Sequence, residues 1–306
     1  MGATLDHALG RSLKFFVKKE SAAGGAYGTD SQEALVGTDA AKILSSSIDF
    51  QIAREDRADS RTTRSLLDRI TGKQEITWSC ESYLLPAGSS TAPDIDPLIE
   101  CAMGGAFGAS VAKTYKLTDT NALPTAHIAR EANGVLREDL FGVWVEEMKI
   151  AGSGGAEPTI SFSGGAFNYA LTGTATCASS GVSSTSLPLL SGEGVGFMVG
   201  SVIDVNGDET IVTSKSTDTL TVKSGTYAND EAVIPSTYTE TTAGVPLNGI
   251  TGSLTLNSVT MPVTSFEVTV TNGIKAFTDE AFEKGTSDFV AGYRSVKGTL
   301  SVRARK

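Results

Sequence analysis

The chain has 306 residues, of which 40% are hydrophobic and 20% are charged, and its formal net charge is −10 at pH 7. Its length allows one large domain or two smaller ones, and its 33 glycines favour strands and turns over long helices. The negative charge disfavours nucleic-acid binding unless a local basic patch overrides it. Three widely spaced cysteines argue against a disulfide framework or a zinc site and favour a reducing cytoplasm.

The first 30 residues are predicted to form a flexible N-terminal arm. They are polar at first, basic around residue 18, and rich in glycine and other small residues from residue 21 onward. Residues 1–19 lack the apolar core of a signal peptide, and no apolar run in the chain approaches the roughly 20 residues of a membrane span. We therefore expect no membrane contact.

Two strands with a charged segment between them predict a hairpin with a protruding loop. Ile48, Phe50 and Ile52 alternate with polar or small residues, and a similar alternation follows over residues 75–85. Residues 54–72 between the strands carry charges of both signs at high density. Loops of this length are usually functional.

A helix is expected over residues 97–103, where apolar side chains recur at helical spacing. Asp96 fits the N-cap, Pro97 the first helical position and Gly104 the end. Further strands are predicted over residues 111–117, 140–150, 159–162 and 168–176. The second of these is apolar on both faces and is expected to be central in its sheet.

Residues 177–246 are predicted to form a small inserted all-β domain on the outer surface. The segment opens with a serine-rich stretch and contains Asn206-Gly207, a strong hairpin signal. It contains eight acidic residues and only two lysines, so it holds more than half of the net negative charge. Residues 31–176 and 247–306 are then the two halves of one discontinuous domain. Its second half is expected to contain alternating strands, a turn at Asn272-Gly273, a short helix from Thr278 and a last strand over residues 296–302.

The motifs that would indicate an enzyme or a metal site are weak. His7 and His127 are the two histidines, and no GxSxG sequence positions a nucleophile beside either. Asp204, Asn206 and Asp208 resemble the start of a calcium loop, but the Gly and the Glu that must follow are absent, and a hairpin explains them better. We expect no catalytic residue, no cofactor and no bound metal.

Several stretches resemble the tail tube proteins of long, non-contractile-tailed bacteriophages. They are ESAAGGAYGTD at 20–30, SIDFQIAREDRADSR at 47–61, KQEITWSCESYL at 73–84 and PDIDPLIECAMG at 93–104. The C-terminal residues 266–303, with Asn272-Gly273, Asp279-Glu280 and Gly292-Tyr293-Arg294, are also similar to that family. The resemblance covers most of residues 20–175 and 247–303.

The resemblance implies two packed β-sheets with a flanking helix. Subunits pair strand edges into hexameric rings, forming a shared barrel, and the rings stack through the arm and the charged loop. Mixed charges suit such stacking better than nucleic-acid binding, because no aromatic residue among them could stack on bases. The candidate inter-ring residues are Arg54, Glu55, Asp56, Arg57, Asp59, Arg61, Arg64 and Asp68.

A tail tube conducts DNA from the capsid to the host cell, and a neutral or acidic lumen would let phosphates pass without binding. The other implied partners are a tape-measure protein and the tail-terminator and tip proteins, in a virion assembled in the bacterial cytoplasm. The alternative function is a secreted or surface β-sandwich adhesin or carbohydrate-binding protein. The candidate lumen-facing residues are Asp49, Gln51, Glu146, Glu267, Thr269 and Thr271.

Overall fold

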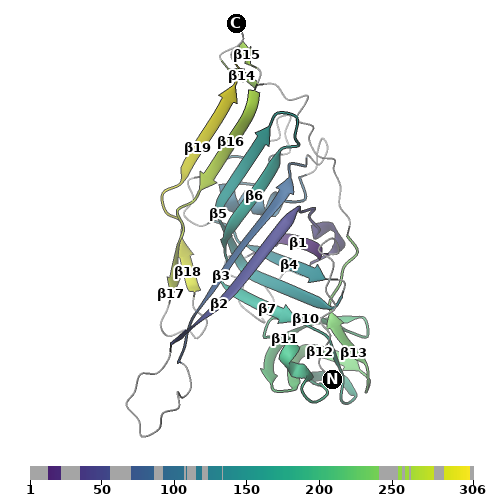
Figure 1. Cartoon of the computed structure of the whole chain (residues 1–306). Coiled ribbons are helices and arrows are strands. Elements are labelled where there is room, and N and C mark those ends of the chain that lie inside the picture. Colours follow the sequence, from purple (N-terminus) through teal and green to yellow (C-terminus); the bar gives the residue numbers. More distant parts are fainter. Residues whose placement is uncertain are drawn as a thin grey trace, which may run out of the picture.

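The computed structural model of the chain describes residues 13–21, 35–55, 70–85, 92–106, 108, 115–118, 123–132, 134–240, 254–256, 259–261, 263–278 and 286–303. The protein is mainly β, as its composition predicts, with several antiparallel sheets (Figure 1). The described residues contain one α-helix, α1 (Asp96–Met103), and two 3-10 turns, η2 (Gly37–Asp39) and η3 (Glu193–Gly196).

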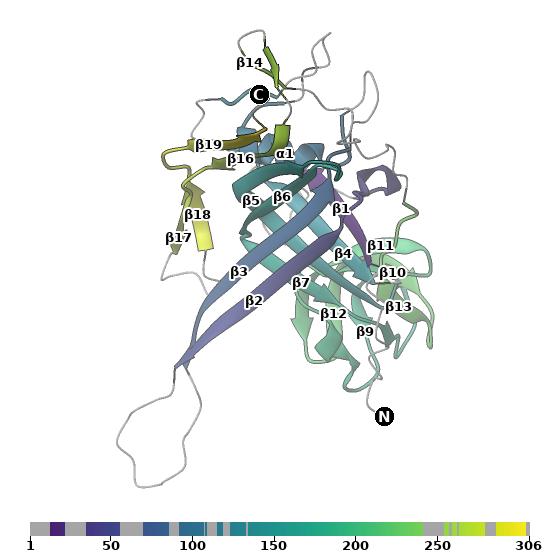
Figure 2. The same ribbon diagram turned by 45° about the horizontal axis from the view of Figure 1, so that its top comes forward.

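The largest sheet has nine strands in two parts that share the long strand β5. The first half of β5 pairs with β4 and β7 and its second half with β6 and β16, so it is central as predicted. The first part has the order β1-β4-β5-β7 and the second the order β19-β16-β5-β6-β3-β2, and the strands of the two parts cross in Figure 2. The bounds are β1 (Leu13–Lys19), β2 (Ser45–Glu55), β3 (Ile70–Tyr83), β4 (Ala126–Ala132), β5 (Leu136–Ser153), β6 (Thr159–Gly165), β7 (Asn168–Thr172), β16 (Val263–Thr271) and β19 (Ser295–Val302).

Two local features allow β5 to pass from one part to the other. Gly142 has a φ of +61°, and a β carbon there would lie 2.2 Å from the ring of Phe167. The register with β6 shifts between Val145 and Glu147, which is a β-bulge. Bulges bend a strand and increase its twist, so the second half of β5 turns away from the first.

The main core lies between the two parts and is covered at one side by α1. Trp78 of β3, Ile128 of β4 and Leu98 of α1 are all buried in one cluster. The helix begins one residue earlier than predicted, so the N-cap is Ile95 rather than Asp96, whose carboxylate instead accepts a hydrogen bond from the Tyr115 hydroxyl. The predicted end is right, because Gly104 adopts a φ of +72° and caps the helix.

The prediction of a flexible arm over residues 1–30 is wrong for residues 13–19. These residues form β1, which pairs with the whole of β4. Phe15, Phe16 and Val17 are consecutive and buried, so both faces of the strand are covered. The lysines at 14, 18 and 19 suggested a solvated segment, but this apolar triplet outweighs them.

The segment from residue 175 to residue 235 forms a six-stranded sheet with its own core. The hairpin predicted at Asn206-Gly207 is confirmed, with φ values of +57° and +84°. The ends of the sheet also meet, since the Leu190 amide donates to Thr176 O (3.0 Å) and the Ala178 amide to Pro188 O (2.9 Å). The sheet therefore closes on itself. Its order is β8 (Ala175–Thr176), β13 (Ala232–Pro235), β10 (Val202–Val205), β11 (Asp208–Ser216), β12 (Thr219–Tyr227) and β9 (Gly181–Pro188).

A buried charged cluster joins this closed sheet to the main one. The Arg137 guanidinium is 1% exposed and forms an ion pair with the fully buried Asp139, which also contacts His127 Nε2 at 2.9 Å. Arg137 Nη1 donates to Ser236 O (2.9 Å), and the guanidinium carbon lies 5.3 Å from the centre of the Tyr238 ring. The chain that leaves the closed sheet is thus fixed to β5.

Two short ribbons complete the fold, β14 (Leu254–Leu256) with β15 (Val259–Met261), and β17 (Lys275–Thr278) with β18 (Thr286–Val290). Asn272-Gly273 lies between β16 and β17, as the predicted turn requires. Thr278 ends β17 rather than capping a helix, and residues 279–285 lie outside the described residues. The strand predicted over residues 111–117 is not formed at 115–117, and its first four residues are also outside the described residues.

Candidate functional site

One face of the six-strand part β19-β16-β5-β6-β3-β2 is polar except where the Trp144 ring packs on Gly165. Residues directly opposite each other in neighbouring strands share a face, so the register identifies its members. Asp49 lies opposite Thr77, Ser79 opposite Ser163, and Glu147 opposite both Ser163 and Thr271. None of these side chains is buried. We call this surface the polar face; its members are Ser45, Ser47, Asp49 and Gln51 of β2, Lys73, Glu75, Thr77, Ser79, Glu81 and Tyr83 of β3, Thr159, Ser161 and Ser163 of β6, Glu147, Lys149, Ala151 and Ser153 of β5, Ser265, Glu267, Thr269 and Thr271 of β16, and Ser295, Lys297, Thr299 and Ser301 of β19.

The polar face carries five carboxylates and three lysines, so its charge is negative. Lys149 Nζ lies 2.7 Å from a carboxylate oxygen of Glu267, and this hydrogen bond and charge raise the pKa of the lysine. Gln51 Nε2 donates to Asp49 Oδ2 (2.6 Å). Lys149 is therefore neutralised within the face, and the acids at its β2–β3 end have no lysine other than Lys73 among the face members of their strands.

Five of the six predicted lumen-facing residues lie together on the polar face: Asp49, Gln51, Glu267, Thr269 and Thr271. Glu146 does not share their register. It lies in the bulge of β5, where its carboxylate accepts the Ile274 amide (2.8 Å) and its carbonyl accepts the Asn272 amide (2.9 Å). Glu147 occupies the place on the face that strict alternation gave to Glu146, because a bulge shifts every later residue by one.

The predicted inter-ring residues fall largely beyond what the structure describes. Arg54 and Glu55 belong to β2, opposite Thr71 and Ile70 of β3, so the predicted hairpin is confirmed up to this point. The other members of the predicted loop, Asp56, Arg57, Asp59, Arg61, Arg64 and Asp68, lie outside the described residues.

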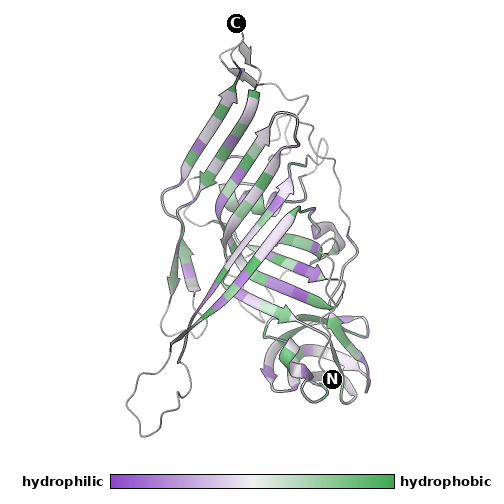
Figure 3. Ribbon diagram, viewed as in Figure 1, coloured by the Kyte–Doolittle hydropathy of each residue, from purple (hydrophilic) through white to green (hydrophobic). Residues whose placement is uncertain are grey.

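The opposite face of the same six strands is apolar but only partly covered. Over β3 and β6 it is core, with Trp78 and Phe162 buried. At the β16–β19 end Val270 of β16 is still buried in the main core, whereas Val268 and the apolar residues of β19 are exposed. The alternation of apolar and polar residues along these strands is visible in Figure 3. Every residue of β19 is exposed, although the strand is regularly paired with β16. We call the uncovered surface the apolar patch; its members are Val268, Val296, Leu300 and Val302.

Both outer strands of this part have an unused edge. Among the described residues, β19 pairs only with β16, and β2 pairs only with β3. An exposed edge presents unpaired backbone donors and acceptors to any other strand. Proteins that remain monomeric shorten, charge or cover such edges, whereas β2 has 11 residues and β19 has eight.

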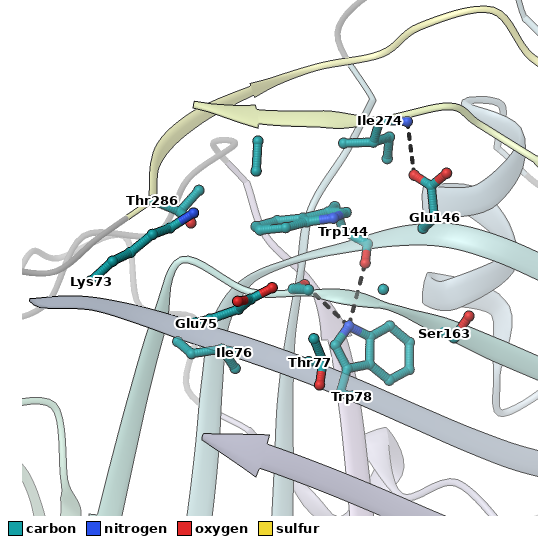
Figure 4. Close-up of a pocket in the computed structure, with 13 residues that line it drawn as sticks. Lys73, Glu75, Ile76, Thr77, Trp78, Trp144, Glu146, Ser163, Ile274 and Thr286 are labelled. Carbon is teal, nitrogen blue, oxygen red and sulfur yellow. Dashed lines mark hydrogen bonds between the residues drawn. The ribbon is translucent and has the colours of Figure 1, made fainter. Parts of the chain in front are cut away.

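A cleft of about 400 Å³ lies between the polar face and the β17–β18 ribbon. Figure 4 shows the Trp144 ring between the chain that carries Ile274 and Thr286 and the strand that carries Glu75. The ring packs on Gly165, where a β carbon would lie 2.3 Å from it. The indole of Trp78 donates to Trp144 O (3.3 Å) and Gly165 O (3.1 Å), so the floor of the cleft is fixed.

The reactive side chains of the described residues are used inside the fold. Burial raises the pKa of Cys80 to about 12 and, helped by Glu231, that of Cys177 to about 11, so both remain thiols near neutral pH. His127 is buried in β4 and stacks on Phe141. Asp204 Oδ1 accepts the Gly207 amide (2.8 Å), so that carboxylate stabilises the hairpin turn.

No group of His, Cys, Asp and Glu side chains that could hold a metal ion occurs in the described part of the chain. The same residues include no helix with the length and apolar character to cross a membrane. No protein-family model matches the chain, and no curated protein matches it.

Proposed function

We propose that the chain is the structural protein of a bacteriophage tail tube, in which copies form hexameric rings and the rings stack into a conduit for DNA. The observation that carries the proposal is the six-strand part of the main sheet. It is polar on one face, apolar and partly uncovered on the other, and unpaired at both edges. Such a sheet is completed by another copy of itself, which removes the edges and covers the apolar patch.

Strand direction favours this junction. The six strands alternate in direction, so β19 and β2 run oppositely. When a second copy is related by rotation, its β2 therefore lies antiparallel to β19 of the first, with the polar faces on the same side. The contact is heterologous, and a rotation that closes gives a ring.

The charges on the two edges suggest the register. Lys297 is the charged residue of the polar row on β19, and Asp49 is the charged residue of the polar row Ser45–Gln51 on β2. Placing the two opposite each other aligns residues 295–302 with residues 44–51. The same register puts Val296 opposite Phe50 and Val302 opposite Leu44, which is itself exposed. Opposite charges and apolar pairs at facing positions both stabilise neighbouring strands.

The polar face is the surface that we assign to the lumen. Each cationic contact to a phosphate adds affinity for DNA, and on this face the acids outnumber the lysines, one of which is paired with Glu267. Passing DNA is then held off the wall by repulsion and water. The resemblance to the tail tube family supplies the rest of the proposal. It implies the tape-measure, terminator and tip proteins as partners, a location in the virion, and a stacking role for the charged loop.

An adhesin or carbohydrate-binding protein is not favoured by a specific observation. Sugar-binding surfaces present aromatic side chains on a shallow face. The exposed aromatic residues among those described, Phe277 and Tyr293, lie at the β17–β19 end rather than on the closed sheet of residues 175–235.

Electron microscopy of the purified full chain, combined with sedimentation over a range of concentrations, tests the proposal. We expect six-fold rings or tubes with a regular axial repeat. A chain that remains monomeric at all concentrations, or that binds glycans as a monomer, would contradict it.

A further inference from the structure

The loop between β18 and β19 holds an aromatic side chain entirely in solvent. Tyr293 has a relative exposure of 101%, the largest among the exposed hydrophobic residues of the described chain. Seven of the fourteen such residues lie within residues 268–302, so the apolar surface is concentrated around this loop. Apolar side chains gathered in this way mark an interaction surface, and tyrosine is enriched at such surfaces.

The backbone on both sides of Tyr293 is fixed. Gly273 has a φ of +58°, and a β carbon on Gly292 would lie 2.2 Å from Gly273 O, so the two loops are in direct backbone contact. Arg294 Nε donates to Asn272 Oδ1 (2.8 Å), and its Nη1 donates to Thr118 O (2.9 Å). These contacts fix the backbone of the loop, so a backbone movement cannot bring the Tyr293 ring onto the surface of its own chain.

The anchor of that second loop is itself buried. Asn272 is 1% exposed, and its Nδ2 donates to Ala102 O (3.0 Å) and to Val145 O (2.9 Å). Its backbone amide donates to Glu146 O (2.9 Å). The loop of Tyr293 is thus fastened to α1 and β5, which are both part of the main core.

A rigid backbone that presents a solvent-exposed tyrosine has the properties of an interface hot spot. Tyrosine supplies a large contact area with few rotatable bonds, and a fixed backbone reduces the entropy lost on binding. Gly292 and Arg294 on either side make contacts within the chain, whereas the side chain of Tyr293 contributes nothing to the fold of a single copy.

We propose that Tyr293 anchors the contact between two copies of this chain. The inference rests on the proposed function, because it uses the pairing of β19 with β2 of the next copy. Tyr293 lies two residues before Ser295, where β19 begins, so its contact is continuous with that edge. The register that pairs Lys297 with Asp49, continued two residues past the start of β19, brings Tyr293 to the level of Ala53 of the second copy, where β2 has its bulge. The small, exposed side chain of Ala53 leaves room for the ring.

The first test compares Tyr293→Ala with Val195→Ala in the full chain. Val195 is a matched control because it is 82% exposed but lies in η3 of the closed sheet. We expect Tyr293→Ala to raise the concentration needed for assembly about tenfold or more, and Tyr293→Phe to have a smaller effect. Val195→Ala should stay within twofold of wild type. The melting temperature of the dissociated chain should be unchanged in all three.

A second measurement does not depend on the strength of assembly. A photo-crosslinking phenylalanine analogue at position 293, in a mixture of heavy- and light-isotope chains, should join the β2 peptide of one copy to the Tyr293 position of another. Cross-links confined to one chain, or assembly of Tyr293→Ala at wild-type concentrations, would overturn the role of Tyr293 while leaving the proposed function intact. A wild-type chain without self-association would overturn both.

Discussion

The closed sheet of residues 175–235 and the six-strand part of the main sheet differ in what happens to their edge strands. The sheet of residues 175–235 meets its own end through the hydrogen bonds of Thr176 and Pro188, so its edge strands are joined. In the part of the chain that the structure describes, the six-strand part of the main sheet has two unpaired edges, and its last strand is exposed along its full length. A sheet that closes needs no partner, whereas one that stays open with an apolar patch does. The proposed assembly therefore uses the main sheet rather than the insert.

The first way to test the comparison is to remove the closed sheet. The sequence placed its end at residue 246, but Ser236 and Tyr238 hold the buried Arg137, and Lys14 Nζ donates to Tyr238 O (3.1 Å). We expect deletion of residues 177–246 to prevent folding of the remainder. Replacement of residues 176–233 by a short Gly-Ser linker should leave it folded, because Ala175 and Val233 are register partners and their backbones are adjacent.

Circular dichroism and sedimentation of the two deletion variants measure whether each folds and assembles. If both variants fold and assemble equally well, the Arg137 cluster has no structural importance. If neither folds, the closed sheet is not an independent unit, and the contrast between the two sheets fails.

The next largest effect is expected from a substitution in the buried cluster of Arg137, Asp139 and His127. Asp139→Asn leaves Arg137 buried without its counter-charge, and we expect a loss of about 3–5 kcal/mol in unfolding free energy at pH 5. Urea unfolding measures this loss. Asp208→Asn, at an exposed position in β11, is the control and should change the unfolding free energy by less than about 0.5 kcal/mol.

The difference between wild type and Asp139→Asn should also depend on pH. Burial alone would raise the pKa of Asp139, but the charge of Arg137 and the hydrogen bond with His127 outweigh burial and lower it. The pKa of an aspartate in the unfolded chain is about 3.9. The stabilisation is therefore complete above this pH and is lost as the pH falls through the lower folded value. A difference that stays constant from pH 5 to pH 2 would contradict this assignment.

A smaller loss is expected from Asn272→Ala, which tests whether the open end of the sheet is rigid. The substitution leaves the buried carbonyls of Ala102 and Val145 without the donors they have now, and we expect a cost of about 2–3 kcal/mol. Asn229→Ala removes an exposed amide and should be nearly neutral. Thermal unfolding of both variants provides the measurement, and equal stability would show that the loop of Tyr293 is not fastened as described.

The smallest effect concerns the charges on the two edges. Lys297→Glu places like charges opposite each other at the proposed junction and should weaken assembly a few-fold, since a cross-strand pair contributes about 0.2–1 kcal/mol. Adding Asp49→Lys to it restores opposite charges and should recover assembly. Sedimentation at two salt concentrations measures both variants. A double variant no better than Lys297→Glu would refute the register.

The sequence predicts most strands of the main sheet and the hairpin of the insert, because alternation and turn residues are local signals. The arm was misjudged because the lysines at 14 and 18 hide the buried triplet of β1. Glu146 is out of register with the other predicted lumen-facing residues because of the bulge of β5, which nothing in the sequence marks, and Glu147 was missed for the same reason.

The junction of the two sheets and the attachment of the Tyr293 loop to α1 could not be predicted, since both depend on residues far apart in the chain. Arg137 and Ser236 are 99 residues apart, and Asn272 and Ala102 are 170 apart. The sequence pattern predicts a turn at Asn272-Gly273, whereas Gly292 and Arg294 are marked only by the family resemblance. Their contacts give a physical reason for them, which is the fixed loop that carries Tyr293.

One measurement tests the central claim most directly. In the proposed register Ser47 of one copy lies opposite Thr299 of the next, so we expect Ser47→Cys/Thr299→Cys to form disulfides between copies after mild oxidation. Within one copy the two positions are separated by five strand spacings, about 24 Å, far beyond the reach of a disulfide. The account predicts a ladder of covalent species that ends at the hexamer, with neither single variant forming it. A double variant that remains monomeric under the same oxidation would contradict the account.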